Sequence, residues 1–167
     1  MRLRIFSAVI VLAVAGIGPL SAAGKEEKVS LEAVPAAVAK AEKAKWPKAQ
    51  ILGIEREEED GNTIFEFGLK EGTRKWDASF NPTGGLVAVE ETIAETDVPG
   101  TVKKVVAKKY AQAKVVLIEK VTEGEGESAK VFYEYKLKTG DDGLEVKLDP
   151  AGKVLGEEQK KGEDLNE

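Results

Sequence analysis

The sequence of 167 residues contains neither cysteine nor histidine. The absence of cysteine excludes disulfides, thiolate metal sites and thiol nucleophiles. The absence of histidine removes the commonest general base and the commonest metal ligand. Aromatic residues make up only 6% of the chain, whereas charged residues make up 33%. This composition indicates a soluble, folded protein with a modest hydrophobic core.

The side chains that remain offer little for catalysis. Beyond the first 23 residues the only serines are Ser30, Ser79 and Ser128, and none stands in a Ser-x-x-Lys context. Without a histidine beside them, these hydroxyls are not expected to act as nucleophiles. Carboxylates are abundant, but general acid–base catalysis needs a pocket that shifts their pKa. The sequence therefore predicts a protein that is not an enzyme and that holds no cofactor and no metal.

The first 23 residues have the pattern of a secretory signal peptide. Arg2 and Arg4 precede an apolar stretch from 5 to 17, and Ser21 and Ala23 place small residues at the positions that a signal peptidase reads. Cleavage is expected after Ala23. The alternative is an N-terminal membrane anchor, for which the apolar run is short. The protein is therefore expected to be periplasmic or secreted.

The charge of the remaining chain bears on its partners. Cleavage removes two arginines, so that 23 Lys and Arg face 30 Asp and Glu, a net charge of −7. A chain of this sign repels phosphate backbones and anionic membrane surfaces. After signal cleavage, the expected partner is therefore neither nucleic acid nor a membrane.

The chain contains an internal repeat. The segment VPAAVAKAEKAKWPKAQILGIE (34–55) aligns without a gap with VPGTVKKVVAKKYAQAKVVLIE (98–119). The second copy then gains four residues in its TEGEGESAK loop, after which FEFGLK (65–70) aligns with YEYKLK (133–138). The same spacing aligns WDASFNPTGGLVAVE with LEVKLDPAGKVLGEE. The sequence therefore predicts two structural copies.

The stretch LDPAGKVLGEE could suggest a metal loop, but its repeat partner argues against one. Asp149-Pro150-Ala151-Gly152 aligns with Asn81-Pro82-Thr83-Gly84. Asp or Asn at the first position, Pro at the second and Gly at the fourth are typical of a type I turn. A metal site would need the carboxylate in both copies and further oxygen ligands nearby. Both stretches are therefore predicted to be hairpin turns.

Each copy predicts one helix followed by strands. Helices are expected over 35–45 and 99–109, where a proline opens the first turn and apolar residues recur at helical spacing. Alternating patterns predict strands over 51–58, 63–70, 76–80, 86–91, 115–122, 131–138, 144–148 and 153–158. Asp60-Gly61 is expected to form a tight turn. Because the helix of the first copy is rich in alanine, Trp46 is expected to fill part of its core.

The predicted fold class is α+β, with two tandem repeats, each of one helix packed on one face of a roughly four-stranded antiparallel sheet. The other face of each sheet is expected to be solvated. Whether the sheets meet edge to edge or at an angle stays open. The expected divisions are a signal peptide (1–23), an N-terminal linker (24–33), repeat 1 (34–95), repeat 2 (96–159) and a disordered tail (160–167).

The repeated pattern resembles that of PepSY-like domains, and within them the β-lactamase-inhibitor-like, PepSY-like family. The resemblance rests on VP..V opening a helix, an aromatic residue near its end, the F/Y-E-F/Y strand and the N/D-P-x-G turn, and it covers about residues 34–158. It implies exported proteins with tandem α/β repeats whose sheets form a surface that docks onto a target protein. Inhibitors of β-lactamase carry disulfides, which this chain cannot form. The resemblance therefore implies a fold rather than inhibition of a β-lactamase.

A candidate docking surface follows from strand alternation. Ile64 and Phe132 occupy equivalent positions and are expected to face away from the helices. Apolar residues on such a face can mark a partner site. The alternatives are that the repeats bury these two side chains against each other, or that they are exposed singly. The candidate partner-binding residues are Ile64, Glu66, Asp77, Ser79, Phe132, Glu134, Lys136, Glu145 and Lys147.

These features predict an exported, non-catalytic binding module that docks a protein partner through its open sheet face. Inhibition of an envelope or secreted hydrolase is one form of this function. The alternative is a periplasmic sensor or carrier that binds a small ligand or peptide between the repeats.

Overall fold

The computed structural model describes residues 25–59 and 61–161. The predicted signal peptide, Asp60 of the predicted tight turn and most of the predicted tail lie outside the described residues. The α-helices are α1 (Ala36–Lys45) and α2 (Gly100–Lys109), and short 3₁₀ helices are η1 (Leu31–Ala33), η2 (Glu95–Asp97) and η3 (Gly126–Ser128). The strands are β1 (Lys25–Lys28), β2 (Gln50–Glu59), β3 (Asn62–Glu71), β4 (Arg74–Phe80), β5 (Leu86–Thr92), β6 (Lys114–Glu123), β7 (Lys130–Thr139), β8 (Asp142–Leu148) and β9 (Val154–Lys161).

All nine described strands belong to one antiparallel sheet, in the order in which they follow one another along the chain. Four strands per copy are confirmed as β2–β5 and β6–β9. However, β5 pairs with β6, from Ala88 opposite Glu123 to Thr92 opposite Glu119, and joins the two copies edge to edge. The prediction of two four-stranded sheets is therefore wrong, and the arrangement that the sequence left open is one continuous sheet.

The segment expected to be a linker also contributes to the sheet. β1 pairs with β2, with Lys28 opposite Glu55, and the amide of Val29 donates to the carbonyl of Ile54 (3.0 Å). At the other end of the sheet, β9 continues to Lys161, two residues past the boundary expected for repeat 2. Backbone pairing thus orders two segments whose side chains are mostly charged.

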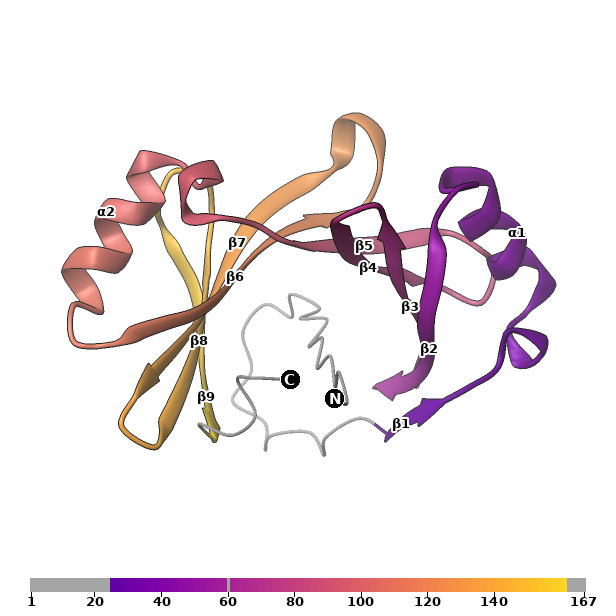
Figure 1. Cartoon of the computed structure of the whole chain (residues 1–167), viewed down its shortest axis with the longest axis horizontal. Helices are drawn as coiled ribbons and strands as arrows, with labels where there is room; N and C mark the ends of the chain where they lie inside the picture. The colour runs from indigo at the N-terminus through magenta and orange to yellow at the C-terminus, as the bar shows by residue number, and fades with distance from the viewer. Residues whose placement is uncertain (1–24, 60, 162–167) are drawn as a thin grey trace.

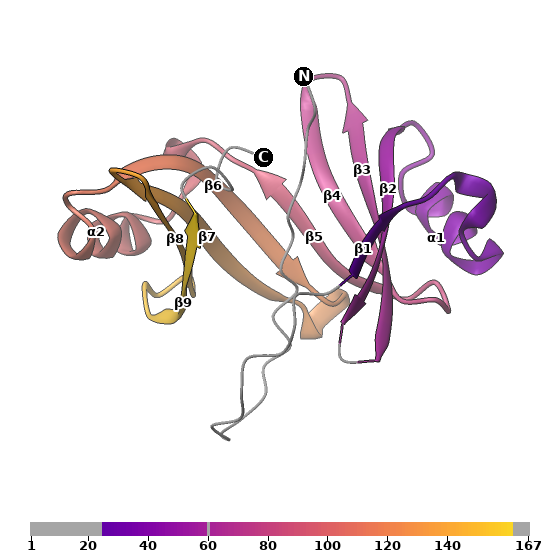
Figure 2. The ribbon, with the colours of Figure 1, turned by 90° about the horizontal axis from the view of Figure 1, so that it is seen from below.

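Both helices lie on the same side of the sheet, as Figure 1 shows. The sheet bends into an arch, α1 and α2 lie at its two ends on the outer side, and Figure 2 shows the same arrangement seen from below. The helices begin directly after Pro35 and Pro99, one residue later than predicted. Proline suits this place because it has no amide hydrogen to leave unpaired at a helix start.

Bulges at equivalent places increase the twist of the sheet. The register shifts between Ile51 and Gly53 on β2, and at the equivalent place between Val115 and Leu117 on β6. A second shift follows Ser79 on β4 and recurs after Lys147 on β8. A bulge bends its strand and adds local twist. The arched shape therefore has a local cause that is duplicated along with the sequence.

Two separate hydrophobic clusters fill the space between the helices and the sheet. In repeat 1, Phe67, Trp76 and Phe80 are buried, and Trp46 packs against Trp76 and Phe80 with ring centroids 5.8 and 6.1 Å apart. This confirms the expectation that Trp46 supplements the alanine-rich helix. In repeat 2 the cluster contains no tryptophan and is built from valine, leucine, isoleucine and tyrosine side chains.

The two Asx-Pro-x-Gly stretches are hairpin turns, as predicted. The amide of Gly84 donates to the carbonyl of Asn81, and that of Gly152 donates to the carbonyl of Asp149, both at 2.9 Å. The side-chain oxygen Oδ1 of each Asx residue also accepts backbone amide hydrogens within its own turn. The Asp149 carboxylate therefore caps a turn, as the neutral Asn81 does in the other copy.

The glycines of these turns also approach the helices closely. Both have a φ of +87°, a region that residues with a side chain rarely adopt. A Cβ on Gly84 would lie 2.7 Å from the carbonyl oxygen of Ala37 in α1, whereas one on Gly152 would lie 3.1 Å from that of Thr101 in α2. Each glycine thus lets a turn pack against the helix of its own repeat.

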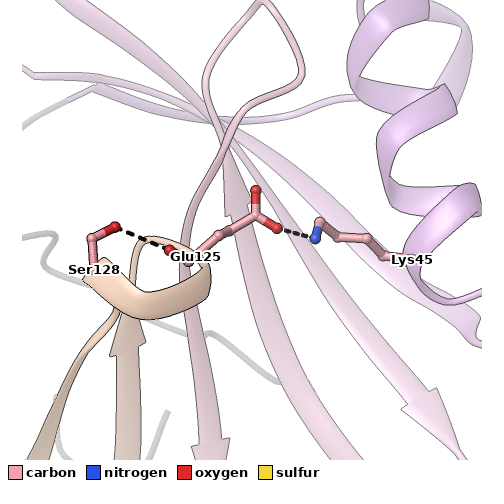
Figure 3. Close-up of polar contacts among 3 residues, drawn as sticks. All are labelled: Lys45, Glu125 and Ser128. Atoms are coloured by element: carbon pink, nitrogen blue, oxygen red, sulfur yellow. Dashed lines mark hydrogen bonds and ion pairs between the residues drawn. The ribbon is translucent and has the colours of Figure 1, made fainter.

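The extra residues of repeat 2 reach across to repeat 1. They form the loop between β6 and β7, in which the amide of Gly124 donates to the carbonyl of Val87 on β5 (2.8 Å). Glu125 forms an ion pair with Lys45 at the end of α1, and Ser128 donates to the Glu125 carbonyl (3.0 Å), as Figure 3 shows. An exposed ion pair contributes at most about 1 kcal/mol. The loop is therefore a second, weaker connection between the copies.

One charged residue lies in the repeat 1 core at a position where repeat 2 has valine. Glu42 on α1 is 2% exposed and its Oε1 atom has no hydrogen-bond partner, whereas the equivalent Val106 packs in the second cluster. Burial raises the pKa of Glu42, although Lys43 opposes the shift. A buried polar atom without a partner costs about 1–3 kcal/mol. Repeat 1 therefore contains a local destabilisation that repeat 2 lacks.

We predict that Glu42→Val raises the free energy of unfolding by about 1 kcal/mol. The free energy gained by removing a buried polar atom without a partner exceeds the free energy lost through the lower helix propensity of valine. Since the pKa of Glu42 is raised by folding, its carboxyl is protonated in both states at low pH. The gain should therefore be smallest below the pKa of a free glutamate, grow between that pKa and the raised folded-state pKa, and level off above it. Urea denaturation at several pH values measures this, and a constant gain at every pH would contradict the account.

We also predict that Gly84→Ala destabilises the protein by about 3 kcal/mol, because the new Cβ adds backbone strain and overlaps a helix carbonyl. Gly152→Ala is the matched variant, because Gly152 has the same φ but its new Cβ would lie farther from the helix carbonyl oxygen. This variant should cost about 2 kcal/mol. Thermal or urea unfolding of both variants shows which substitution costs more stability. Equal losses would indicate that strain alone matters and that the contact with α1 has no effect.

Candidate functional site

The face of the sheet opposite the helices, here called the open face, is the inner side of the arch (Figure 1). No described helix covers it, and it is continuous through the pairing of β5 with β6. Paired residues place these side chains on it in rows across the strands: Glu57 and Ile64; Glu55, Glu66, Ser79, Ala88, Glu123 and Lys130; Gly53, Gly68, Asp77, Glu90, Val121 and Phe132; Thr92, Glu119, Glu134, Lys147 and Gly156; Leu117, Lys136, Glu145 and Glu158.

All nine residues predicted from the sequence lie on this face. Ile64 on β3 and Phe132 on β7 are both half-buried, but they stand in different rows with β4, β5 and β6 between them. They therefore do not form one apolar patch. Because the sheets are joined edge to edge, the two repeats also do not bury these side chains against each other.

Phe132 has neighbours of two kinds. It stands opposite Val121 on β6, and Lys147 places its Nζ 4.3 Å from the centre of the Phe132 ring. Ile64 stands opposite Glu57. Each apolar side chain is thus set among charged groups, an arrangement that suits an anchor residue within a polar surface.

The two copies carry carboxylates at four equivalent places on the open face. Superposing the repeats by their strand registers pairs Glu55 with Glu119, Glu66 with Glu134, Asp77 with Glu145 and Glu90 with Glu158. The helix-side core differs between the copies and contains more aromatic residues in repeat 1 than in repeat 2. The pattern of acidic residues on the open face has stayed the same.

Repeat 2 also places two lysines among its carboxylates. Lys136 Nζ lies 3.4 Å from Glu119 Oε2, and Lys147 Nζ lies 3.5 Å from Glu134 Oε1 and 2.8 Å from Glu123 Oε1. Burial would lower the pKa of Lys136, but Glu119 and Glu145 outweigh this and raise it. These two lysines offset much of the negative charge on the repeat 2 half of the open face.

Repeat 1 has no lysine at the equivalent positions, which are Gly68 and Ser79. Ser79 donates a hydrogen bond from its hydroxyl to Glu66 Oε2 (3.3 Å). Burial raises the pKa of Asp77 to about 7, and the charges of Glu119 and Glu55 add to the shift while Lys136 opposes it. In the repeat 1 half of the open face, Asp77 therefore lies in an environment that disfavours its negative charge.

The equivalent carboxylates of repeat 2 are shifted in the same direction. Burial raises the pKa of Glu134, with a contribution from Glu145, while Lys147 opposes it. Burial also raises the pKa of Glu145, with Lys160 and Lys136 opposing. Each half of the open face thus holds carboxyl groups whose burial disfavours their negative charge.

Sequence reasoning missed several members of this face, namely Glu55, Glu57, Glu90, Glu119, Glu123 and Glu158. The repeat alignment already paired four of them, but the orientation of Glu55 and Glu119 depends on the bulges in β2 and β6. Within residues 25–59 and 61–161, no group of three or more Asp and Glu has the geometry to hold a metal ion. In the same part of the chain, no helix is long and apolar enough to cross a membrane.

Solved structures with a similar fold include several from species of Bacteroides. A "DUF2874 family protein" from Bacteroides ovatus matches with a TM-score of 0.62 and 19% identity, covering 75% of this chain and 87% of that one. One of the "putative periplasmic proteins" from Bacteroides eggerthii has a TM-score of 0.61, 17% identity and coverages of 75% and 88%. A "BLIP-like protein" from Bacteroides fragilis has a TM-score of 0.59, 17% identity and coverages of 76% and 87%. At these identities the similarity shows the fold.

The search of curated proteins finds no match. The family model described as "Putative beta-lactamase-inhibitor-like, PepSY-like" matches twice, over residues 21–88 and 68–156. The two matches overlap at residues 68–88, each contains one of the two α-helices, and together they span most of the chain. This protein therefore belongs to the β-lactamase-inhibitor-like, PepSY-like family.

Proposed function

We propose that the protein is an exported, non-catalytic binding module whose open face docks a protein partner. The observation that carries the proposal is the continuity of this face across both repeats, with no described helix over it. Periplasmic descriptions of similar structures support export, and the family to which the chain belongs is described by its likeness to inhibitors.

The size of the open face suits this role. Eight strands, β2 to β9, with at least seven residues each cover roughly 800 Å², at about 4.8 Å between strands and about 3.3 Å per residue. A stable protein interface buries about 800 Å² on each partner. A concave face of this area accommodates a protruding loop or helix of a folded protein. Inhibition of a hydrolase would follow if that protruding element borders the active site of the enzyme.

The geometry gives less support to the alternative, in which a small ligand or peptide binds between the two repeats. The repeats meet edge to edge along β5 and β6, so that the two described units do not enclose a layer between their sheets. Their hydrophobic clusters lie on the helix side and are filled by side chains of their own repeat. Docking on the open face is therefore the function that the geometry supports best.

We predict that Ile64→Gln combined with Phe132→Gln abolishes retention of the partner. Loss of two apolar anchors should weaken binding at least tenfold, because each anchor of an interface contributes more than about 1 kcal/mol. The chain without its signal peptide is immobilised and exposed to envelope and supernatant proteins of the source organism. The retained proteins are identified by mass spectrometry and their affinities are measured.

The matched control is Leu31→Gln combined with Val115→Gln, since both residues are exposed apolar side chains outside the open face. Circular dichroism establishes that both double variants fold. A partner that is lost only from the Ile64 and Phe132 variant supports docking on the open face. If both double variants and the parent retain the same set of proteins, the proposal is wrong.

A further inference from the structure

We propose that two copies of this chain form a symmetric dimer, in which β9 pairs antiparallel with β9 of the second copy and the pair is centred on Gln159. The inference goes beyond the proposed function and does not rest on it. It comes from comparing what lies beside β5 and β9, which are equivalent strands of the two repeats.

The last strand of repeat 1 shows what its outer edge binds. β5 pairs with β6 over residues 88–92, and this pairing extends the sheet into repeat 2. The repeat offset places residues 156–160 of β9 at the equivalent positions. Among the described strands, β9 has a neighbour on one side only. The edge that joins the two repeats therefore recurs at the end of repeat 2, where no described strand pairs with it.

The exposure of equivalent side chains follows this difference. Glu90 on β5 is 7% exposed, whereas Glu158, its equivalent on β9, is exposed. Glu157, Gln159 and Lys161 are exposed as well. A strand at the edge of a sheet presents amide and carbonyl groups that can pair with a strand of another chain. β9 therefore offers eight residues for such pairing.

The opposite edge of the sheet is closed to the same kind of join. Residues 119–123 of β6 pair with β5, and the equivalent residues of β2 are 55–59. β1 already pairs with residues 55–58 of β2. A second copy therefore cannot add its β9 to β2 in the way that β5 adds to β6. Such an addition would repeat from molecule to molecule and build an open-ended filament.

β1 itself is poorly suited to pairing with its own copy. It has four residues, Lys25–Lys28, and all of them are charged. In a symmetric antiparallel pair the central residue lies opposite itself, so that any centre within β1 places like charges together. Like charges directly opposite each other destabilise a strand pair. The structure therefore leaves β9 as the edge that can pair with itself.

The charge pattern of β9 is self-complementary in one register. The strand ends in the sequence Glu-Glu-Gln-Lys-Lys. A symmetric pair centred on Gln159 sets Glu158 opposite Lys160 twice. It also sets Glu157 opposite Lys161 twice. A centre one residue earlier or later would set Glu158 or Lys160 opposite itself. Because opposite charges stabilise cross-strand pairs and like charges destabilise them, the charges select the register centred on Gln159.

The symmetry also determines how the two open faces lie. The two-fold axis of an antiparallel strand pair is perpendicular to the sheet, so that each copy keeps its helices on the same side of the dimer. The open faces of both copies therefore lie together on the other side. Two docking surfaces on one side suit a partner that offers two binding elements, because binding of the first raises the effective concentration of the second.

Sedimentation velocity of the chain without its signal peptide, over a wide range of concentrations, tests the dimer. Because the paired stretch of β9 is short, a reversible equilibrium between monomer and dimer is expected. A chain that stays monomeric at its highest soluble concentration would overturn the proposal. Species larger than a dimer that grow with concentration would also overturn it, because they indicate open-ended association.

Two single substitutions test the register. Lys160→Glu sets glutamates opposite each other at two places in the pair, and Glu158→Lys sets lysines there. Each should raise the dissociation constant of its dimer about tenfold, because two attractive pairs become repulsive. The two substitutions change the net charge in opposite directions, so that weakening by both is not an effect of net charge.

The matched control is Lys48→Glu, which makes the same change of charge as Lys160→Glu at an exposed position between α1 and β2. It should leave the dissociation constant within about twofold of that of the parent, because the charge is distant and screened. Equal effects of Lys48→Glu and Lys160→Glu would overturn the proposal.

A mixture of the two β9 variants should restore the dimer. In a mixed pair, every glutamate at these positions again stands opposite a lysine. The mixed dimer should therefore have a dissociation constant within about threefold of that of the parent, measured with a fluorescent label on one variant. Circular dichroism establishes that each variant folds. If the mixture associates no more tightly than either variant alone, the register is wrong and the proposal fails.

Hydrogen exchange locates the interface. Alternate amides of β9, those that point away from β8, should exchange more slowly in the parent dimer than in the Lys160→Glu variant. A dimer whose protection appears on β1 or on the helices instead would overturn the proposal.

Discussion

The backbone pairing of β5 with β6 is the interaction on which the architecture depends. Five residue pairs, from Ala88 opposite Glu123 to Thr92 opposite Glu119, join the edges of two units that each contain their own core. A shift of this register by one residue would turn every side chain of repeat 2 to the other side of the sheet. In the observed register both helices lie on the outer side of the arch, and the carboxylates of both repeats share the inner side. The loop that pairs Gly124 with Val87 and Lys45 with Glu125 supports the same join.

The two copies differ on the helix side of the sheet but share their acidic positions on the open face. On the helix side the two copies fill their cores with different side chains. In repeat 1, Trp46 and Trp76 fill the space left by the small alanine side chains of α1, whereas valines of α2 fill the core of repeat 2. Packing tolerates such exchanges as long as volume and apolar character are kept. On the open face the four acidic positions remain in both copies, although carboxylates on neighbouring strands repel one another. Under the proposed function, these shared acidic positions belong to the docking surface.

The sequence predicted the local structure closely, because local structure depends on residues that lie near one another in the chain. The helices begin within one residue of the prediction, and the Asx-Pro-x-Gly turns have the predicted hydrogen bonds. β1 was missed because KEEK has no apolar alternation, and its order comes from pairing with β2 rather than from burial. The continuity of the sheet was not predictable, because β5 and β6 are separated by η2 and α2 and nothing in their side chains specifies the pairing. The nine candidate residues were placed on the open face by alternation, whereas the placement of Glu55 and Glu119 beside them needed the bulges that only the structure shows.

The central claim is that a partner docks on the open face. The most direct measurement is NMR of the isotope-labelled chain, without its signal peptide, in the presence and absence of a captured partner. Docking on the open face predicts that the changes in chemical shift concentrate on residues of that face, such as Ile64 and Phe132. Changes that concentrate on α1 and α2, on the outer side of the arch, would contradict the claim.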